Sequence, residues 1–189
     1  MEREIERSKV VVRWIVGAAL FGAVAYLKSR GQVAAGWSTI VGLTAALALL
    51  NLAYTAVLRR SAPPWLKYVT TATDLGLISI LVAVTGGSRS VFFLAYFIVL
   101  VSNSFRYGMG MALYVATGFN VMYAALLALD RPEGDLTIEA VKIFAFWGLA
   151  LYAGYLAMRF QRQARILQSY EEVIAALRHE VAELRRGAP

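Results

Sequence analysis

The chain has 189 residues, of which 59% are apolar, and a net charge of +7 at neutral pH; this apolar share exceeds the roughly 45–50% of soluble globular domains, so the composition indicates a membrane protein. Because the basic residues lie mostly beside apolar segments rather than in one solvated stripe, we exclude nucleic acid as a partner. Cysteine is absent, so the chain itself forms no disulfide, thiol switch or cysteine metal site.

Six apolar segments, bounded by charged residues, glycine or proline, are candidate membrane spans. They lie near residues 10–28, 37–58, 66–85, 90–105, 108–129 and 138–158, and the fourth is the shortest. The first segment, at about twenty residues, is longer than the usual ~7–15 residues of a signal-peptide core, so we expect it to be retained. We therefore predict an all-α fold, in which residues 1–158 form a transmembrane bundle of six helices.

The orientation of these segments is predicted from the basic residues near their ends, because translocation keeps lysine and arginine on the cytoplasmic side. With the N-terminus inside, the outer side holds only Lys28, Arg30, Arg89 and Arg131. The cytoplasmic side holds Arg3, Arg7, Lys9, Arg13, Arg59, Arg60, Lys67, Arg106, Arg159, Arg162 and Arg165. We expect a multi-pass protein embedded in membrane lipid, with both termini in the cytoplasm.

The composition changes after Met158, and residues 159–189 form a charged tail. Positions at alternating steps of three and four make a heptad seam, which predicts a parallel coiled coil and therefore a homodimer. The seam consists of Phe160, Gln163, Leu167, Tyr170, Ile174, Leu177, Val181 and Leu184. The alternative is an amphipathic helix on the lipid surface. The acidic residues of the tail favour the coiled coil, because anionic lipid would repel them.

Charged residues within the third and sixth predicted spans include Asp74, Glu139 and Lys142, and an unpaired charge there costs at least a few kcal/mol. Asp74 should face the bundle interior, as a protonation switch, as a ligand acceptor or as the partner of a polar side chain. The candidate polar partners are threonine hydroxyls, Asn51, Asn103 and Asn120. Glu139 and Lys142, three residues apart, can form an ion pair on one helix. Lys142 is also a candidate partner of Asp74, although the two differ in predicted depth.

The segment VAVTGGSRSVFFL, residues 82–94, interrupts an apolar run with two glycines and an arginine. A glycine pair adopts positive φ and exposes backbone N–H groups, which suits a sharp turn between two spans. The same segment could bind a flat lipophilic molecule such as a quinone, which needs N–H or cationic donors above aromatic walls. The candidate ligand-binding residues are Gly86, Gly87, Arg89, Ser90, Phe92 and Phe93.

The six spans and this short loop resemble the N-terminal sensor domains of bacterial membrane histidine kinases, most closely the redox-responsive RegB-type kinases. These carry Gly-Gly-x-x-Asn-Pro-Phe between spans three and four, and residues 86–92 read GGSRSVF, which matches three of the five fixed positions. Asp74 and the YGMG of residues 107–110 resemble further features of such sensors. The resemblance implies a quinone ligand, a bacterial inner-membrane location and a cytoplasmic kinase or other output domain.

His179 is the only histidine of the chain and occupies an outward heptad position. This position suits a phosphoacceptor and equally a solvated residue. A basic residue and a proline usually come soon after the His-Glu of a phosphoacceptor, whereas residues 179–189 read HEVAELRRGAP, in which Arg185 and Pro189 come six and ten positions after His179. We therefore interpret His179 as solvated.

The patterns together predict a signal-input module. In it the bundle binds a lipophilic or membrane-surface cue, and the resulting change in helix packing is transmitted through the sixth span to the tail. We do not expect an enzyme, because no metal-ligand cluster, no nucleophile with a base and no phosphate-binding loop is present. One alternative is a small transporter or channel that uses Asp74, Glu139 and Lys142, although no internal repeat supports it. Another is a membrane scaffold dimerised by its tail.

Overall fold

The computed structural model describes residues 2–60, 63–130 and 136–187, with side chains over 8–59, 63–129 and 136–178. Its elements are α1 (Glu2–Ser29), α2 (Trp37–Arg60), α3 (Leu66–Val84), the 3-10 turns η1 (Gly87–Arg89) and η2 (Val91–Phe93), α4 (Leu94–Tyr107), α5 (Met109–Asp130) and α6 (Leu136–Gly187). These ranges contain helices and no strand, which confirms the all-α fold.

Five of the helices, α1, α2, α3, α5 and α6, contain stretches long and apolar enough to cross a membrane. Helix α4 has 14 residues and is only about 21 Å long at ~1.5 Å per residue, less than the ~30 Å of a hydrocarbon core. The segment predicted as a span at 90–105 begins in the structure with η2, so its regular helix is shorter than expected. Six helices are therefore present in the predicted order, and five are full-length candidates.

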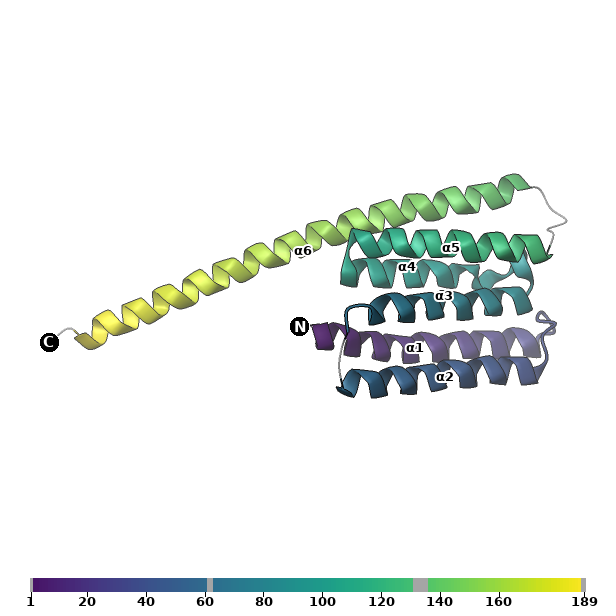
Figure 1. The fold of residues 1–189 in the computed structure, drawn as a ribbon, viewed down its shortest axis with the longest axis horizontal. Helices are drawn as coiled ribbons and strands as arrows, with labels where there is room; N and C mark the ends of the chain where they lie inside the picture. The colour runs from purple at the N-terminus through teal and green to yellow at the C-terminus, as the bar shows by residue number, and fades with distance from the viewer. Residues whose placement is uncertain (1, 61–62, 131–135, 188–189) are drawn as a thin grey trace.

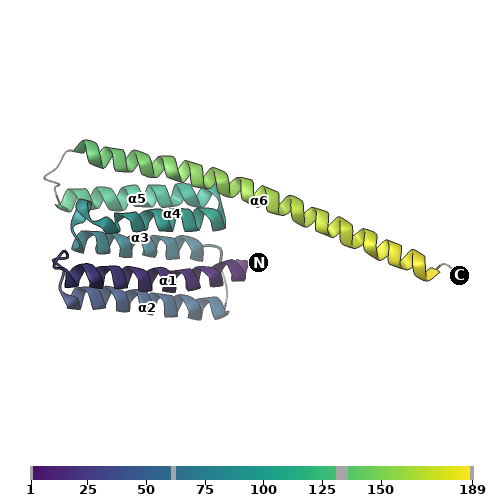
Figure 2. The same cartoon turned by 180° about the vertical axis from the view of Figure 1, so that it is seen from behind.

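The helices lie side by side, with the chain running back and forth between two ends of the bundle (Figure 1). Helices α1 and α2 pair with each other along one side, and α3 to α6 pack together on the other. The N-terminus lies at the end from which α6 extends, as Figure 2 also shows from behind. We call this end of the bundle the near end. The opposite end, which carries the turn between α3 and α4, is the far end.

Aromatic rings fill the core between α4, α5 and α6. Phe119 stacks on Phe146 with ring centroids 3.9 Å apart, and the Tyr96 ring meets Phe119 edge-on at 5.0 Å. All three side chains are fully buried. The buried Tyr96 hydroxyl hydrogen-bonds Ser79 on α3 at 2.7 Å, so this polar group is satisfied and links α3 to α4.

Helix α6 is continuous across the boundary predicted at residues 158 and 159. Its 52 residues make a rod of about 78 Å at ~1.5 Å per residue. The first half packs against α4 and α5, and the second half leaves the bundle at the near end (Figure 1). The membrane segment and the tail are thus one helix, so a rotation or shift of its first half is carried directly to the second.

The packing of α6 on α5 depends on a close approach at Gly154. A Cβ atom placed there would lie 2.5 Å from Met109 Sδ and 3.2 Å from Met109 Cα. Because the second of these atoms belongs to the backbone, a larger residue would push the helices apart.

We expect Gly154→Leu to lower the free energy of unfolding by about 1–3 kcal/mol, the usual cost of overpacking. The matched control is Gly148→Leu on the same helix, because a Cβ atom at Gly148 meets no atom within 4 Å. Both variants gain similar helix propensity, so their difference isolates the contact. The measurement is unfolding of the detergent-solubilised chain in SDS, followed by circular dichroism. Equal stability of the two variants would contradict this packing.

Candidate functional site

The turn between α3 and α4 depends on its two glycines. Gly86 has φ of +123° and Gly87 has φ of +59°, which confirms the positive φ predicted for the pair. The Ser90 N–H donates to the Gly87 carbonyl at 3.0 Å, closing η1. The Ser90 hydroxyl oxygen then accepts from the Phe92 N–H at 3.2 Å and starts η2. The chain therefore reverses direction in two tight, internally hydrogen-bonded turns.

The six residues predicted to bind a ligand at this turn do not all face outward. Gly86 and Arg89 are exposed, whereas Gly87, Ser90, Phe92 and Phe93 are buried. The Phe93 ring meets the rings of Tyr96, Phe97, Phe119 and Tyr123 at centroid distances of 5.3 to 5.9 Å. The aromatic residues expected to form the walls of a ligand site thus pack in the core of the bundle, and the exposed part of the turn consists of Gly86, the Arg89 cation and Val91.

The turn contacts the start of α6 through a far-end cluster, which we define as Ser88, Phe93, Tyr123, Glu139 and Lys142. Lys142 Nζ donates to the Ser88 carbonyl at 2.7 Å and to Glu139 Oε2 at 3.0 Å. The same ammonium group lies 5.5 Å above the centre of the Phe93 ring. The Tyr123 hydroxyl donates to Glu139. The predicted ion pair of Glu139 with Lys142 is confirmed.

Local geometry explains why these side chains meet. Residues three apart share one face of a helix, so Glu139 and Lys142 both point from α6 toward α5 and the turn. Glu139 stands in the first turn of α6, where the helix dipole favours a carboxylate. Two features that the sequence analysis treated separately, the glycine turn and the charged pair, therefore form one site. Tyr123 and Ser88 were not predicted as members.

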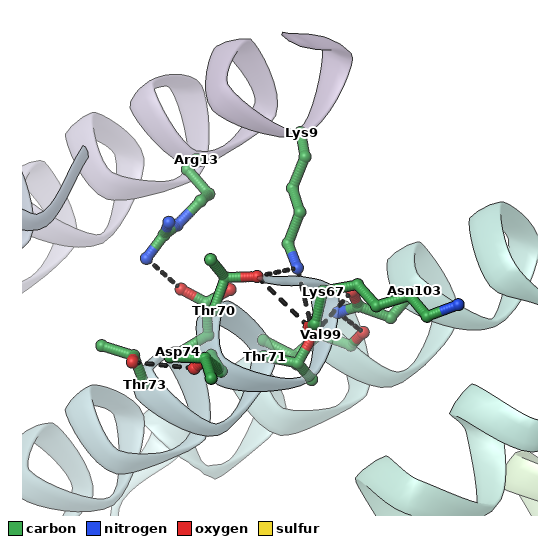
Figure 3. A network of polar contacts seen from close by, with 10 residues as sticks. Lys9, Arg13, Lys67, Thr70, Thr71, Thr73, Asp74, Val99 and Asn103 are labelled. Carbon is green, nitrogen blue, oxygen red and sulfur yellow. Dashed lines mark hydrogen bonds and ion pairs between the residues drawn. The ribbon is translucent and has the colours of Figure 1, made fainter. Parts of the chain in front are cut away.

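A second polar group, the near-end cluster, consists of Lys9, Arg13, Thr70, Thr71, Asp74 and Asn103 (Figure 3). Arg13 Nη2 lies 2.7 Å from Asp74 Oδ1, and the two side chains are only 8% and 11% exposed. Asp74 therefore faces the bundle interior as predicted. Its partner is a cation on α1 that the sequence analysis assigned to the topology signal.

The near-end cluster continues from α1 across α3 to α4 through hydroxyl groups. Lys9 Nζ donates to Thr70 Oγ1 at 2.8 Å and to Thr71 Oγ1 at 3.0 Å, and Thr71 Oγ1 lies 3.1 Å from Asn103 Oδ1 (Figure 3). Lys9 is 2% exposed. Two contacts therefore hold α1 against α3. One is the buried ammonium group of Lys9 on its two hydroxyls, and the other is the Arg13–Asp74 ion pair one turn further along α1.

Asp74 pairs with none of the lysine and asparagine side chains considered as its partners, and the depth difference that argued against Lys142 is confirmed. Lys142 does not reach it, because this lysine is held at the far end by Glu139 and Ser88. Asn103 bonds to Thr71 and to the Val99 carbonyl, while both amide atoms of Asn51 and Oδ1 of Asn120 are buried without a hydrogen-bond partner. The sequence did contain a signal for this pair, because Arg13 is a charge inside the first apolar segment. The helices that carry Arg13 and Asp74 also both start at the near end.

The part of α6 beyond the bundle exposes its predicted seam. Leu167, Tyr170, Ile174 and Leu177 have exposed fractions of 64%, 63%, 49% and 55% in the single chain. The side chains of Val181 and Leu184, like that of His179, lie outside the described residues. Large apolar side chains repeated along one isolated helix form a surface that a partner helix would cover.

Comparison with protein-family models, with curated proteins and with solved structures finds no match for this chain. Within the described residues, no three His, Cys, Asp or Glu side chains gather in a way that could hold a metal ion. The functional interpretation therefore rests on the two clusters and on α6.

We expect Asp74→Asn to lower the free energy of unfolding by about 3–5 kcal/mol, because it leaves the buried guanidinium of Arg13 without its carboxylate. Arg13→Gln should cost less, since Asp74 then keeps Lys9 and Arg106, which line the same cavity. The double variant should lose less than the sum of the single losses. SDS unfolding followed by circular dichroism measures all three. Additive losses would show that the two side chains do not interact.

Proposed function

We propose that this chain is the membrane-embedded input module of a bacterial two-component-type signalling protein. In this proposal a cue at the far end changes the packing of the bundle, and the change reaches an output domain through a dimer of α6. The observation that carries the proposal is the far-end cluster, because it attaches the turn between α3 and α4 to the start of the one helix that leaves the bundle.

The far-end cluster supports transmission because it is largely shielded from the surroundings and links the turn to one helix, with Lys142 half-buried and Glu139 buried. The Lys142 ammonium group bonds to a backbone carbonyl of the turn at 2.7 Å, so a displacement of Ser88 has to move or break the contact. Breaking the contact removes one acceptor of the cation, and moving the cation with the turn draws it away from Glu139, which is 7% exposed. A cue that favours one of two turn conformations would therefore favour one of two positions of α6.

The exposed stripe of α6 supports the homodimer. In the heptad frame of the predicted seam, Ile174 and Val181 occupy a positions, and Leu177 and Leu184 occupy d positions. β-branched residues at a with leucine at d favour a parallel two-stranded coiled coil. A parallel dimer brings the two copies of α6 together where they leave the bundle, which is the arrangement that a kinase or other output domain would need.

A lipophilic cue, with a quinone as first candidate, fits the exposed part of the turn. Arg89 supplies a cation and Gly86 supplies accessible backbone, both suited to a carbonyl acceptor. Because Phe92 and Phe93 are buried, a quinone ring would lie against the outer surface of the turn, beside the exposed side chain of Val91, rather than between these phenylalanines. We place the module in the bacterial inner membrane with six crossings, of which the fourth is made by α4 together with the preceding turn η2. Both termini are then in the cytoplasm, following the distribution of basic residues.

The transporter alternative has less support. A transport path would need Asp74 to exchange partners, whereas its carboxylate is held 2.7 Å from Arg13 by a buried contact. The scaffold alternative shares the coiled coil and differs in one respect: a scaffold would not respond to a cue.

Because the chain lacks cysteine, single introduced cysteines report the dimer directly. We expect Ile174→Cys to form a disulfide-linked dimer on mild oxidation in membranes, and Ala175→Cys, one residue further along the exposed helix, to form much less. The readout is the dimer fraction on non-reducing gels. Equal cross-linking at the two positions would argue against a seam through Ile174, and no cross-linking at either would remove the dimer.

We expect oxidised and reduced ubiquinone analogues to give different cross-linking efficiencies at residue 174. The double variant Glu139→Gln/Lys142→Met, which preserves net charge, should abolish this difference while leaving basal cross-linking in place. Lys28→Met, a cation outside the far-end cluster that bonds the Val33 carbonyl, is the matched control and should keep the response. A parent chain that cross-links equally with both analogues would remove the quinone as cue. A response that survives the double variant would remove the far-end cluster as its route.

A further inference from the structure

A cavity of about 130 Å³ lies among α1, α2, α3 and α4, and it runs from the near-end cluster to Val84 and Thr85 beside the glycine turn. One face of α1 lines it from Lys9 to Val24, through Val16 and Leu20. These 15 residue steps correspond to about 22 Å along the helix axis at ~1.5 Å per residue. The cavity is therefore a long groove parallel to the helices rather than a compact chamber.

The groove opens to the surroundings of the bundle. Phe21 and Ile98, which line it from α1 and α4, have exposed fractions of 38% and 45%. Most of its remaining lining is aliphatic, contributed by α1, α2 and α3. A chain that enters sideways from the lipid phase would meet only apolar side chains over most of this length.

Charge is confined to the near end of the groove. The charged lining residues are Lys9, Arg13 and Arg106 against the single carboxylate of Asp74. Arg13 is 8% exposed, and while one of its terminal nitrogens pairs with Asp74, its Nε is buried without a hydrogen-bond partner. The near end of the groove therefore has an excess of positive charge and a donor that remains available.

We infer that this groove binds an anionic glycerophospholipid, with its phosphate at Arg13 and Arg106 and one acyl chain along α1. The length is sufficient, because the groove is about 22 Å long at ~1.5 Å per residue and one leaflet of the ~30 Å hydrocarbon core is only about 15 Å thick. The groove also runs parallel to the helices, as lipid tails do. The charge fits, because basic pockets between membrane helices bind anionic head groups. An acyl chain would also fill the gap between the hairpin of α1 and α2 and the other helices.

This site does not depend on the proposed signalling function. Its charged residues are at the opposite end of the bundle from the glycine turn, while its apolar lining reaches Val84 and Thr85 beside that turn. It requires only that the helices sit in a lipid bilayer. A lipid held there would stabilise α1 against α3 whether or not α6 transmits a signal.

Native mass spectrometry of the full chain in mild detergent tests the inference. Phosphatidylglycerol and phosphatidylcholine with identical acyl chains are titrated in parallel, and glycerol phosphate without acyl chains forms a third arm. We expect one phosphatidylglycerol per chain, bound more tightly than phosphatidylcholine by about fivefold for each basic residue in contact with the phosphate. Glycerol phosphate alone should not bind detectably, because the apolar groove contributes most of the buried surface.

Two pairs of variants separate the head group from the acyl chain. Arg106→Gln should reduce the preference for phosphatidylglycerol about fivefold, whereas Arg59→Gln, an exposed cation on α2 outside the groove, should not. Val16→Trp should block the groove and remove binding, whereas Ile15→Trp, on the exposed face of the same helix, should not. Leu77→Phe on α3 fills the groove from the other wall and replaces Val16→Trp if that variant does not fold.

Equal binding of the two lipids by the parent chain would overturn the inference, as would phosphatidylglycerol binding that both groove-filling variants leave unchanged. A groove that instead holds a second copy of the chain would show itself as a dimer lost in Val16→Trp with lipid binding retained, which also overturns it. Loss of lipid binding with an intact cross-linking response at residue 174 would leave the signalling proposal standing and confirm that the two sites are separate.

Discussion

A charge inside an apolar helix bundle has to be paired or hydrogen-bonded, because leaving it alone there costs several kcal/mol. This requirement decides which helices of the chain lie together at each end. At the near end Arg13 on α1 needs Asp74 on α3. At the far end Lys142 on α6 needs Glu139, Tyr123 and a carbonyl of the turn. The first contact joins α1 to α3, and the second joins α6 to α5 and to the turn. Apolar packing is not directional, so it does not by itself select these pairings.

The two clusters have different structural consequences. The near-end cluster joins α1 to α3 through the Arg13–Asp74 ion pair. Beside this ion pair the apolar side chains of α1, α2 and α3 line an open groove instead of packing against one another. The far-end cluster sits on the tightly packed aromatic core and ends at α6. In the proposed mechanism a disturbance at the turn reaches α6, whereas a lipid in the groove would act first on the position of α1.

The continuity of α6 gives the chain its asymmetry. One helix starts in the far-end cluster, forms part of the core and continues well beyond the near end (Figure 1). Its first half is covered by α4 and α5, and its second half exposes a repeated apolar stripe along 160–177. Because no break in the helix separates the two halves, the exposed apolar stripe and the contact with the turn belong to the same helix.

The sequence by itself determined the helical class, the order of the helices and most of their limits: the segments predicted at 37–58, 66–85 and 108–129 became α2, α3 and α5 within two residues at each end. It also determined the pairing of Glu139 with Lys142, because hydropathy, helical periodicity and i,i+3 spacing are local properties. Only the tertiary structure decided that Arg13 pairs with Asp74, that Phe92 and Phe93 enter the core, and that the turn meets α6. These outcomes depend on the relative depth and rotation of helices far apart in the chain, which are set by side-chain packing and by the need to neutralise buried charge.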